Sequence, residues 1–323
     1  MWFMCHNVKE FTGNVTGGRK RCLTDRRLDG QVVVVTGANT GIGKETANQL
    51  ALRGAKLYIG CRDLAKAEIA VKEMRDQNPK SDVTALKLDL SSLKSVREFA
   101  ADLANREKRL DILVNNAGVF ACPEWKTEDG FEMQFGTNHL GSFLLTLSLT
   151  PLLKQSPSAR IVNVSSAAHM IGHIDFDNIN QRNGIYTPMK AYAHSKLANV
   201  LFTRELAKRL GPNSTVRVYA LNPGTVKTDA QRHVTSAAFE WFMKRAFLTP
   251  EMGAQTSLYC SLDPTLDNET GFYYDNCKRV NRLISEATDD KVSERLWELS
   301  CQLVNLEDHL RRLFIKTPTS AWN

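Results

Sequence analysis

The chain has 323 residues, of which 42% are hydrophobic and 24% charged, and its formal net charge is +7. This composition excludes a disordered or fibrous chain and can build one large domain or two small ones, of which we expect one. The modest basic excess fits an anionic partner, but no basic run is interleaved with aromatic residues, so we do not expect nucleic-acid binding.

Cysteine usage and the N-terminus bear on the cellular compartment. The seven cysteines are scattered without a Cys-x-x-Cys motif and indicate reduced thiols. The apolar run at residues 1–5 is interrupted by His6 and Lys9, so we expect neither a signal peptide nor a transmembrane helix. The basic residues at 19–21 and 26–27 can touch an anionic membrane surface, but a solvated lead-in segment explains them better. We expect a cytoplasmic or cytosol-facing protein, with peripheral contact with an intracellular membrane left open.

Strands and helices are expected to alternate from Gln31 onward. Before that point the sequence has little periodicity, which predicts a loose N-terminal extension over 1–29. The β-branched run 32–35 is typical of a strand buried on both faces. Further strands are expected at 56–61, 83–89, 112–115, 160–165, 216–221 and, as the last one, 271–274. Helices are expected at 44–52, 63–77, 93–106, 131–149, around Tyr192 and Lys196, and at 290–303 with an aspartate cap.

This alternation predicts a Rossmann-type, doubly wound parallel sheet of the α/β class, with right-handed crossovers. Ligands of such sheets bind beyond the carboxyl ends of the strands. We expect a single domain over 30–280, followed by a C-terminal helix and tail over 281–323 whose last residues, 316–323, are frayed.

A glycine-rich turn follows the first strand. Gly37, Gly41 and Gly43 stand in the pattern Thr-Gly-x-x-x-Gly-x-Gly, which also includes Asn39, Thr40 and Ile42. Such glycines let the backbone approach a pyrophosphate, whose charge is met by the amides of the following helix. Glycine turns also end strands for steric reasons alone, but between a buried strand and a helix they predict dinucleotide binding.

The tip of the second predicted strand indicates which dinucleotide is bound. An arginine at this point can pair with the 2′-phosphate of NADP, whereas an acidic residue would hold the ribose of NAD. Arg62 therefore predicts NADP(H), with Lys44 as a helper. Asp63 is explained by a role as the N-cap of the next helix.

Tyr192 and Lys196 lie four positions apart, and on a helix they share one face. A tyrosine with a pKa of about 10 is a poor base, and a neighbouring ammonium favours its phenolate. The pair predicts a proton-transferring tyrosine, with an ordinary surface pair as the alternative. Ser165 and Ser166 close a predicted strand, where a serine hydroxyl can stabilise a substrate oxygen or merely cap the strand.

These motifs together resemble the short-chain dehydrogenase/reductase family over roughly 29–274, and the words around Ser166 and Tyr192 resemble NADP-dependent retinol dehydrogenases. The resemblance implies Ser166, rather than Ser165, as the substrate-oxygen donor, and Asn138 in a proton relay behind Lys196. A helix-interior amide bonded to backbone is the alternative for Asn138. The resemblance further implies contacts with the cofactor by Asp89, Leu90, Asn116, Ala117, Gly118, Val119, Tyr192, Lys196, Pro223, Gly224, Val226 and Thr228.

The substrate is expected to be a small apolar alcohol or carbonyl compound, retinol or retinal by resemblance. A broad apolar face over 231–248 fits a greasy lid, an interfacial anchor or a plain core helix about equally well. A catalytically silent NADP-binding regulatory protein and a reductase of steroid or other lipid carbonyls remain as alternatives, and a homodimer stays open. His169, His173 and His194 lack the spacing of a zinc site, so we expect no metal.

Overall fold

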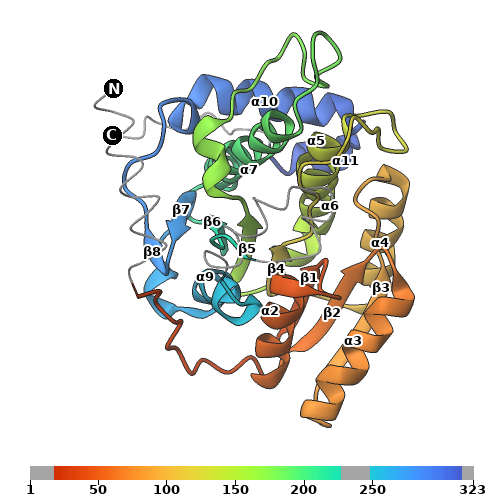
Figure 1. Ribbon diagram of the computed structural model, residues 1–323. Helices are drawn as coiled ribbons and strands as arrows, with labels where there is room; N and C mark the ends of the chain where they lie inside the picture. Colours follow the sequence, from red (N-terminus) through yellow and green to blue (C-terminus); the bar gives the residue numbers. More distant parts are fainter. Residues whose placement is uncertain (1–17, 227–247, 315–323) are drawn as a thin grey trace.

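Eight strands form one sheet in the computed structural model, which describes residues 18–226 and 248–314. The order across the sheet is β3-β2-β1-β4-β5-β6-β7-β8 (Figure 1). All neighbours pair in parallel except β8, which is antiparallel to β7. The strands are β1 (Val32–Thr36), β2 (Lys56–Cys61), β3 (Asp82–Lys87), β4 (Ile112–Asn115), β5 (Ala159–Val164), β6 (Val216–Asn222), β7 (Phe272–Asp275) and β8 (Lys278–Arg279). The predicted doubly wound α/β sheet is confirmed.

Helices cover both faces of this sheet (Figure 1). The α-helices are α2 (Gly41–Leu52), α3 (Leu64–Gln77), α4 (Leu93–Arg106), α5 (Met133–Phe135), α6 (Ser142–Leu153), α7 (Pro188–Leu210), α9 (Pro250–Leu262), α10 (Asp290–Leu303) and α11 (Asp308–Arg312). Short π or 3₁₀ turns are η1 (Gly136–Gly141), η2 (Ala167–Ile171), η4 (Pro264–Leu266) and η5 (Glu286–Thr288). Side chains of α2, α3 and α9 pack with Val33 and Val35, whereas those of α4, α6, α7 and α10 pack with Val32 and Val34. The strand is therefore buried on both faces, as its β-branched run predicts.

The strand order reverses between β1 and β4, because the chain first builds outward through β2 and β3 and then crosses back. The loops after β1 and β4 consequently leave the sheet in opposite directions and open a crevice between them. Open α/β sheets bind their ligands at such a switch point.

Several element boundaries differ from the sequence-based expectation. The predicted helix 131–149 consists of α5, the π-helical turn η1 and α6, which together run from Met133 to Leu153. Gly271–Tyr274 does not contain the last strand, since β8 follows it, and α11 was not expected at all. β8 and α11 have two and five residues, too short for a periodic pattern to show.

The apolar core continues across the boundary that we expect after residue 280, between the main domain and the C-terminal helix and tail. Trp297 of α10 and Phe314 lie in the same apolar cluster as Leu144 and Leu201, and both are at most 3% exposed. The C-terminal segment thus completes the core on the α7 face. The expected lid over 231–248, except Leu248, and the expected frayed end 316–323 lie outside the described residues.

The segment 18–28, which we call the strap, corrects the expectation of a loose extension. It contains no helix or strand, yet it is anchored along its length. Leu28 is fully buried in the core beneath β1. The Cys22 amide donates to the side chain of Gln255 in α9 (2.9 Å). Arg26 lies 3.5 Å from the carboxylate of Asp267. The contacts of Cys22 and Arg26 join residues more than 200 positions apart, which no local pattern reveals.

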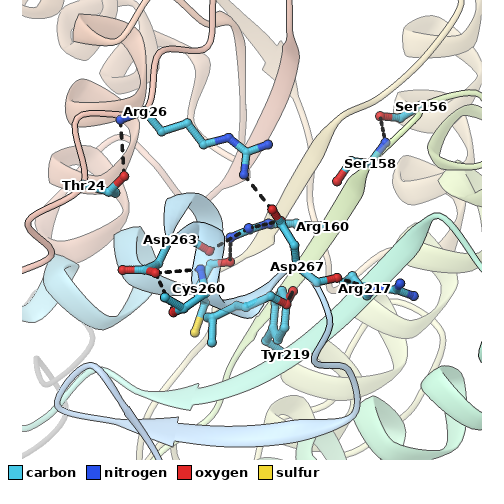
Figure 2. Close-up of polar contacts among 12 residues, drawn as sticks. Thr24, Arg26, Ser156, Ser158, Arg160, Arg217, Tyr219, Cys260, Asp263 and Asp267 are labelled. Atoms are coloured by element: carbon cyan, nitrogen blue, oxygen red, sulfur yellow. Dashed lines mark hydrogen bonds and ion pairs between the residues drawn. The ribbon is translucent and has the colours of Figure 1, made fainter.

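Arg160 lies at the amino ends of β5 and β6, on the side of the sheet opposite to the carboxyl ends of the strands, and connects several segments there (Figure 2). Its guanidinium is buried and donates to the carbonyl oxygens of Cys260 (3.0 Å) and Asp263 (2.7 Å) at the C-terminal end of α9. A third bond reaches the carboxylate of Asp267, which also pairs with Arg26 of the strap. A cation is stabilising at the C-terminus of a helix, so we interpret this cluster as structural.

In the ranges 18–226 and 248–314, no helix is both long and apolar enough to cross a membrane. The six cysteines that these ranges contain are free thiols.

Candidate active site

A cavity of about 390 Å³ lies at the carboxyl ends of the central strands, at the switch point. Its lining includes most of the residues predicted to contact a dinucleotide. These are Gly37, Asn39, Thr40, Gly41, Ile42, Gly43, Arg62, Asp89, Leu90, Asn116, Ala117, Gly118, Val119, Tyr192, Lys196 and Pro223. Segments spread over almost 190 positions of the sequence thus meet in one place.

The glycine turn after β1 fits closely against the loop after β4. Gly37 has φ +64°, and a Cβ there would lie 2.9 Å from the Cα of Ala117. A Cβ on Gly43 would lie 2.3 Å from the side-chain nitrogen of Asn116, which donates to the carbonyl oxygens of Thr36 (2.9 Å) and Gly37 (3.3 Å). The turn therefore requires glycine at both positions.

Helix α2 begins directly behind this turn with no acidic residue in its first turn. Its N-cap, Thr40, makes no side-chain bond to the helix amides. These amides face the cavity with the positive end of the helix dipole, an arrangement that suits a pyrophosphate. We expected this helix to start at residue 44, but it starts at Gly41, because the glycine turn itself winds into the first helical turn.

The tip of β2 carries positive charge on the rim of the cavity. Arg62 lines it, together with Asp63 and Lys66. Asp63 accepts a bond from the Lys66 amide (3.1 Å) and is the N-cap of α3, as predicted. Lys44 does not line the cavity and pairs with Glu73 of α3, an arrangement that does not support the expected role beside Arg62.

Asp89 and Leu90 form the cavity wall beyond β3. The Asp89 carboxylate accepts two bonds from Ser91, at 2.9 Å from the amide and 2.6 Å from the hydroxyl. Leu90 is 5% exposed, and a Cβ on Gly141 would lie 2.3 Å from its carbonyl oxygen. The wall is thus held tightly against the start of α6.

Tyr192 and Lys196 line the inner end of the cavity, and Ser166, which is outside the lining, hydrogen-bonds with the Tyr192 phenol. Burial raises the pKa of Tyr192 to about 12, and its hydrogen bond with Ser166 opposes that rise. The Lys196 ammonium donates to the carbonyl oxygen of Val164 (2.9 Å) and lies 5.5 Å from the centroid of the Tyr192 ring. Burial lowers the pKa of Lys196 to about 8. Burial thus outweighs the lowering of the Tyr192 pKa that we expect from the neighbouring ammonium, and Tyr192 is a protonated phenol at neutral pH.

The two adjacent serines point to different partners. The Ser165 hydroxyl donates to the backbone carbonyl of Lys196 (2.7 Å) and is 1% exposed. Ser166 is the N-cap of η2, accepts a bond from the Ala168 amide (3.1 Å), and contacts the phenol of Tyr192. Ser165 lines the cavity, but its hydroxyl attaches α7 to the end of β5. Ser166 is outside the lining, and its hydroxyl is the one that contacts the phenol.

Asn138 lies in the π-helical turn η1, whose widened backbone brings its side chain against the loop after β4. Its oxygen accepts from the Val119 amide (2.8 Å), and its nitrogen donates to the Val119 carbonyl (3.0 Å) and to the Ser195 hydroxyl (3.0 Å). The side chain is therefore bonded mainly to backbone, the alternative considered from sequence. π-Helical turns of this kind occur frequently at functional sites.

The turn after β6 closes the cavity on its other side. Pro223 lines it, whereas Gly224 and Val226 stand outside the lining. Val226 is buried and forms a parallel bridge with Leu248. Thr228, predicted to contact the cofactor, lies outside the described residues.

Several lining residues were missed from the sequence, among them Lys66, Phe120 and Thr137. Lys66 stands one helical turn beyond Asp63, and its charge next to Arg62 was a usable signal. Phe120 packs edge to face on the Tyr192 ring, with centroids 4.6 Å apart. Thr137 had no signal, because its place depends on the π turn. Across 18–226 and 248–314, no three His, Cys, Asp or Glu side chains gather as metal ligands.

Comparison with known proteins places these motifs among related sequences. The profile described as short chain dehydrogenase matches residues 31–238. Human retinol dehydrogenase 12 is 50% identical over 299 residues, which cover 92% of this chain and 92% of that protein. Human retinol dehydrogenase 11 is 48% identical over 286 residues, 88% of this chain and 89% of that protein.

Solved structures with similar folds are found as well. A crystal structure from Mycobacterium paratuberculosis superimposes with a TM-score of 0.74 at 35% identity, covering 90% of this chain and 99% of that chain. The Pseudomonas aeruginosa RhlG/NADP active-site complex superimposes with a TM-score of 0.63 at 28% identity, covering 77% of this chain and 95% of that chain.

Proposed function

The chain belongs to the short-chain dehydrogenase family, whose members are oxidoreductases that bind a nicotinamide cofactor, and from this premise we propose an NADP(H)-dependent enzyme that interconverts an apolar alcohol and its aldehyde or ketone. The observation that carries the proposal is that Tyr192 and Lys196 line one end of a glycine-lined cavity while Ser166 hydrogen-bonds with the Tyr192 phenol. A proton donor, a second hydroxyl and a buried cation are the groups that carbonyl reduction needs.

The residues of the cavity fit NADP(H). Gly37 and Gly43 let the turn pack against Ala117 and Asn116, and the amides of α2 face the place where the pyrophosphate would lie. Arg62 and Lys66 would hold the 2′-phosphate, since the one carboxylate at this tip, Asp63, caps α3. When bound, the nicotinamide supplies or accepts the hydride.

In the proposed mechanism Tyr192 donates its proton to the carbonyl oxygen while the hydride reaches the carbonyl carbon, which yields the alcohol. Ser166 donates a hydrogen bond to the same oxygen and stabilises the charge that develops there. Lys196 favours the phenolate that Tyr192 becomes, because its ammonium lies beside the ring. Asn138 holds the loop at Val119 in place beside Lys196 and would support the return of a proton from solvent. Alcohol oxidation uses the same groups in reverse.

We infer an apolar substrate, retinol or retinal in class. Phe120 presents an aromatic surface against Tyr192, and the relatives at about half identity carry the name retinol dehydrogenase. Steroid or other lipid carbonyls suit the same surface and form the second candidate class. A silent NADP-binding regulatory protein is disfavoured, because Ser166 hydrogen-bonds with the Tyr192 phenol and the Lys196 ammonium lies 5.5 Å from the centroid of the Tyr192 ring.

A substrate panel tests the proposal. Purified protein is assayed with retinal, steroid ketones and aliphatic aldehydes, each with NADPH and with NADH, in parallel with Tyr192→Phe. We expect turnover of an apolar carbonyl with NADPH, and a loss of roughly 10²–10⁴-fold in Tyr192→Phe with NADPH binding retained. Absence of turnover across the panel, or equal rates in both proteins, would contradict the assignment.

A further inference from the structure

Asn222, the last residue of β6, joins the two halves of the proposed site. Its side-chain oxygen accepts hydrogen bonds from the amides of Ala167 (3.3 Å) and Gly224 (3.1 Å). Ala167 directly follows Ser166 and begins η2, whereas Gly224 belongs to the turn that closes the cavity on the cofactor side. Asn222 is only 6% exposed, so water cannot readily replace either partner. One carboxamide therefore sets the spacing between these two segments.

The other end of this carboxamide is held by an anion. The nitrogen of Asn222 donates to a carboxylate oxygen of Asp275 in β7 (3.3 Å). A flipped amide would bring its own oxygen against that carboxylate, which is unfavourable at a buried position. Asp275 in turn pairs with Arg19 of the strap (3.8 Å), and the two side chains are 17% and 12% exposed. The cation thus pairs with the carboxylate that holds the Asn222 carboxamide.

Arg19 also touches the turn directly. A Cβ on Gly224 would lie 2.5–2.7 Å from three guanidinium atoms, and φ of Gly224 is +83°. The flat guanidinium therefore lies against the backbone of the turn, where only glycine leaves it room. The next residue of the strap is fixed as well, since the Lys20 amide donates to the side chain of Asn276 (2.8 Å). Arg19 reaches this place from a segment that precedes the whole sheet.

We propose that Arg19, Asp275 and Asn222 are positioning residues that hold Ser166 and the Pro223–Gly224 turn at their working separation. The roles of Ser166 and of the turn rest on the proposed function, whereas the contacts themselves do not. Removing Arg19 takes away the guanidinium that lies against the Gly224 turn and pairs with Asp275. The turn and the Asp275 carboxylate can then move, and the Asn222 carboxamide bonded to both moves with them, which loosens the Ala167 and Gly224 amides together. The strap is then part of the active-site architecture rather than a lead-in.

Hydrogen exchange of the full chain tests this directly. We expect Arg19→Ala to speed exchange of the Ala167 and Gly224 amides while strand amides of β4 keep their protection. Asp275→Asn, which keeps the side-chain shape, should give the same pattern of exchange. It replaces Arg19→Ala in this experiment if Arg19→Ala does not fold. The matched control is Arg21→Ala, which removes a neighbouring strap arginine whose partner, Glu251, is half exposed. This control should leave both amides unchanged.

Ligand binding supplies a second readout. Arg19→Ala should weaken NADPH roughly tenfold, the effect of losing about 1.4 kcal/mol of charge-assisted contact. Adenosine 2′,5′-bisphosphate should bind as before, because Arg62 lies at the other end of the cavity. Three outcomes would each overturn the proposal. The first is unchanged exchange of the Ala167 and Gly224 amides in both variants, and the second is an equal increase in their exchange rate in Arg21→Ala. The third is faster exchange of these amides with an unaltered affinity for NADPH. If wild-type protein binds neither nucleotide but exchange responds as expected, the proposed cofactor fails and the coupling through Asn222 stands.

Discussion

The Lys196 ammonium lies 5.5 Å from the centroid of the Tyr192 ring and is held there by a 2.9 Å hydrogen bond to the carbonyl oxygen of Val164. The two side chains leave adjacent turns of α7, so the helix sets their relation, while the end of β5 sets the position of the charge. Within the residues described, Lys196 forms no ion pair with a carboxylate. A buried cation without an anionic partner costs stability.

This cost predicts an unusual pH dependence. The pKa of Lys196 is lowered from 10.5 to about 8, so the unfolded chain binds the proton more tightly than the folded one. The penalty is full below pH 8 and fades as the pH rises to 10.5. Lys196→Met should therefore raise the free energy of unfolding at pH 7 by on the order of 1–3 kcal/mol, after loss of the bond to Val164.

Urea denaturation at pH 7 and pH 10 measures this difference. The gain of Lys196→Met should shrink at the higher pH, and the variant should have no reductase activity at either. A destabilised variant at pH 7, or a gain that does not change with pH, would show that the charge of Lys196 is compensated in the folded protein.

Arg62 is predicted to select NADP(H) over NAD(H). Arg62→Ala should weaken NADPH by roughly 10–100-fold, the value of a charge-assisted phosphate contact, and leave NADH nearly unaffected. Fluorescence titration with both nucleotides measures this, with Lys72→Ala on the exposed side of α3 as the control. Equal losses for NADPH and NADH would mean that Arg62 does not contact the 2′-phosphate.

Alanine substitutions of Ser165 and Ser166 should have different effects, the first on the stability of the protein and the second on its activity. Ser165→Ala removes the bond to the Lys196 carbonyl and should cost about 1 kcal/mol of unfolding free energy with most activity kept. Ser166→Ala should lower kcat by roughly 10²–10³-fold, because a donor to the substrate oxygen is lost. Thermal unfolding and steady-state rates of both variants decide this, and reversed behaviour would assign the chemistry to Ser165.

Gly43 should be irreplaceable in the phosphate turn. A Cβ there would lie 2.4 Å from the carbonyl oxygen of Gly37, a backbone atom that cannot turn aside as a side chain can. Gly43→Ala should cost about 1–3 kcal/mol and abolish binding of NADPH and NADH alike. The control is Gly18→Ala, which meets no atom within 4 Å. Nucleotide titration and thermal unfolding give the comparison, and normal binding by Gly43→Ala would refute the tight turn.

Local patterns in the sequence were sufficient for most of the fold. The run Val32–Val35 shows a strand buried on both faces, because each side chain of a strand faces one side of the sheet and all four are apolar. The glycine spacing after β1, Arg62 at the tip of β2, and the pairing of Tyr192 with Lys196 are likewise short-range features. Their geometry follows from the turn, the strand end and the helical repeat.

Contacts between distant segments decided the rest. Which of Ser165 and Ser166 faces Tyr192 depends on how η2 and α7 pack, and a one-residue shift along an extended chain reverses the side. The place of Asn138 depends on a π-helical turn that no periodicity signals. Arg19 meets Asp275 across 256 positions, and Arg160 meets Asp267 across 107, so neither partner is visible from the other's neighbourhood. The sequence by itself determined the elements and the chemical groups of the site, because both are set by local backbone geometry; the tertiary structure decided which groups meet and what holds them, because that depends on packing across the whole chain.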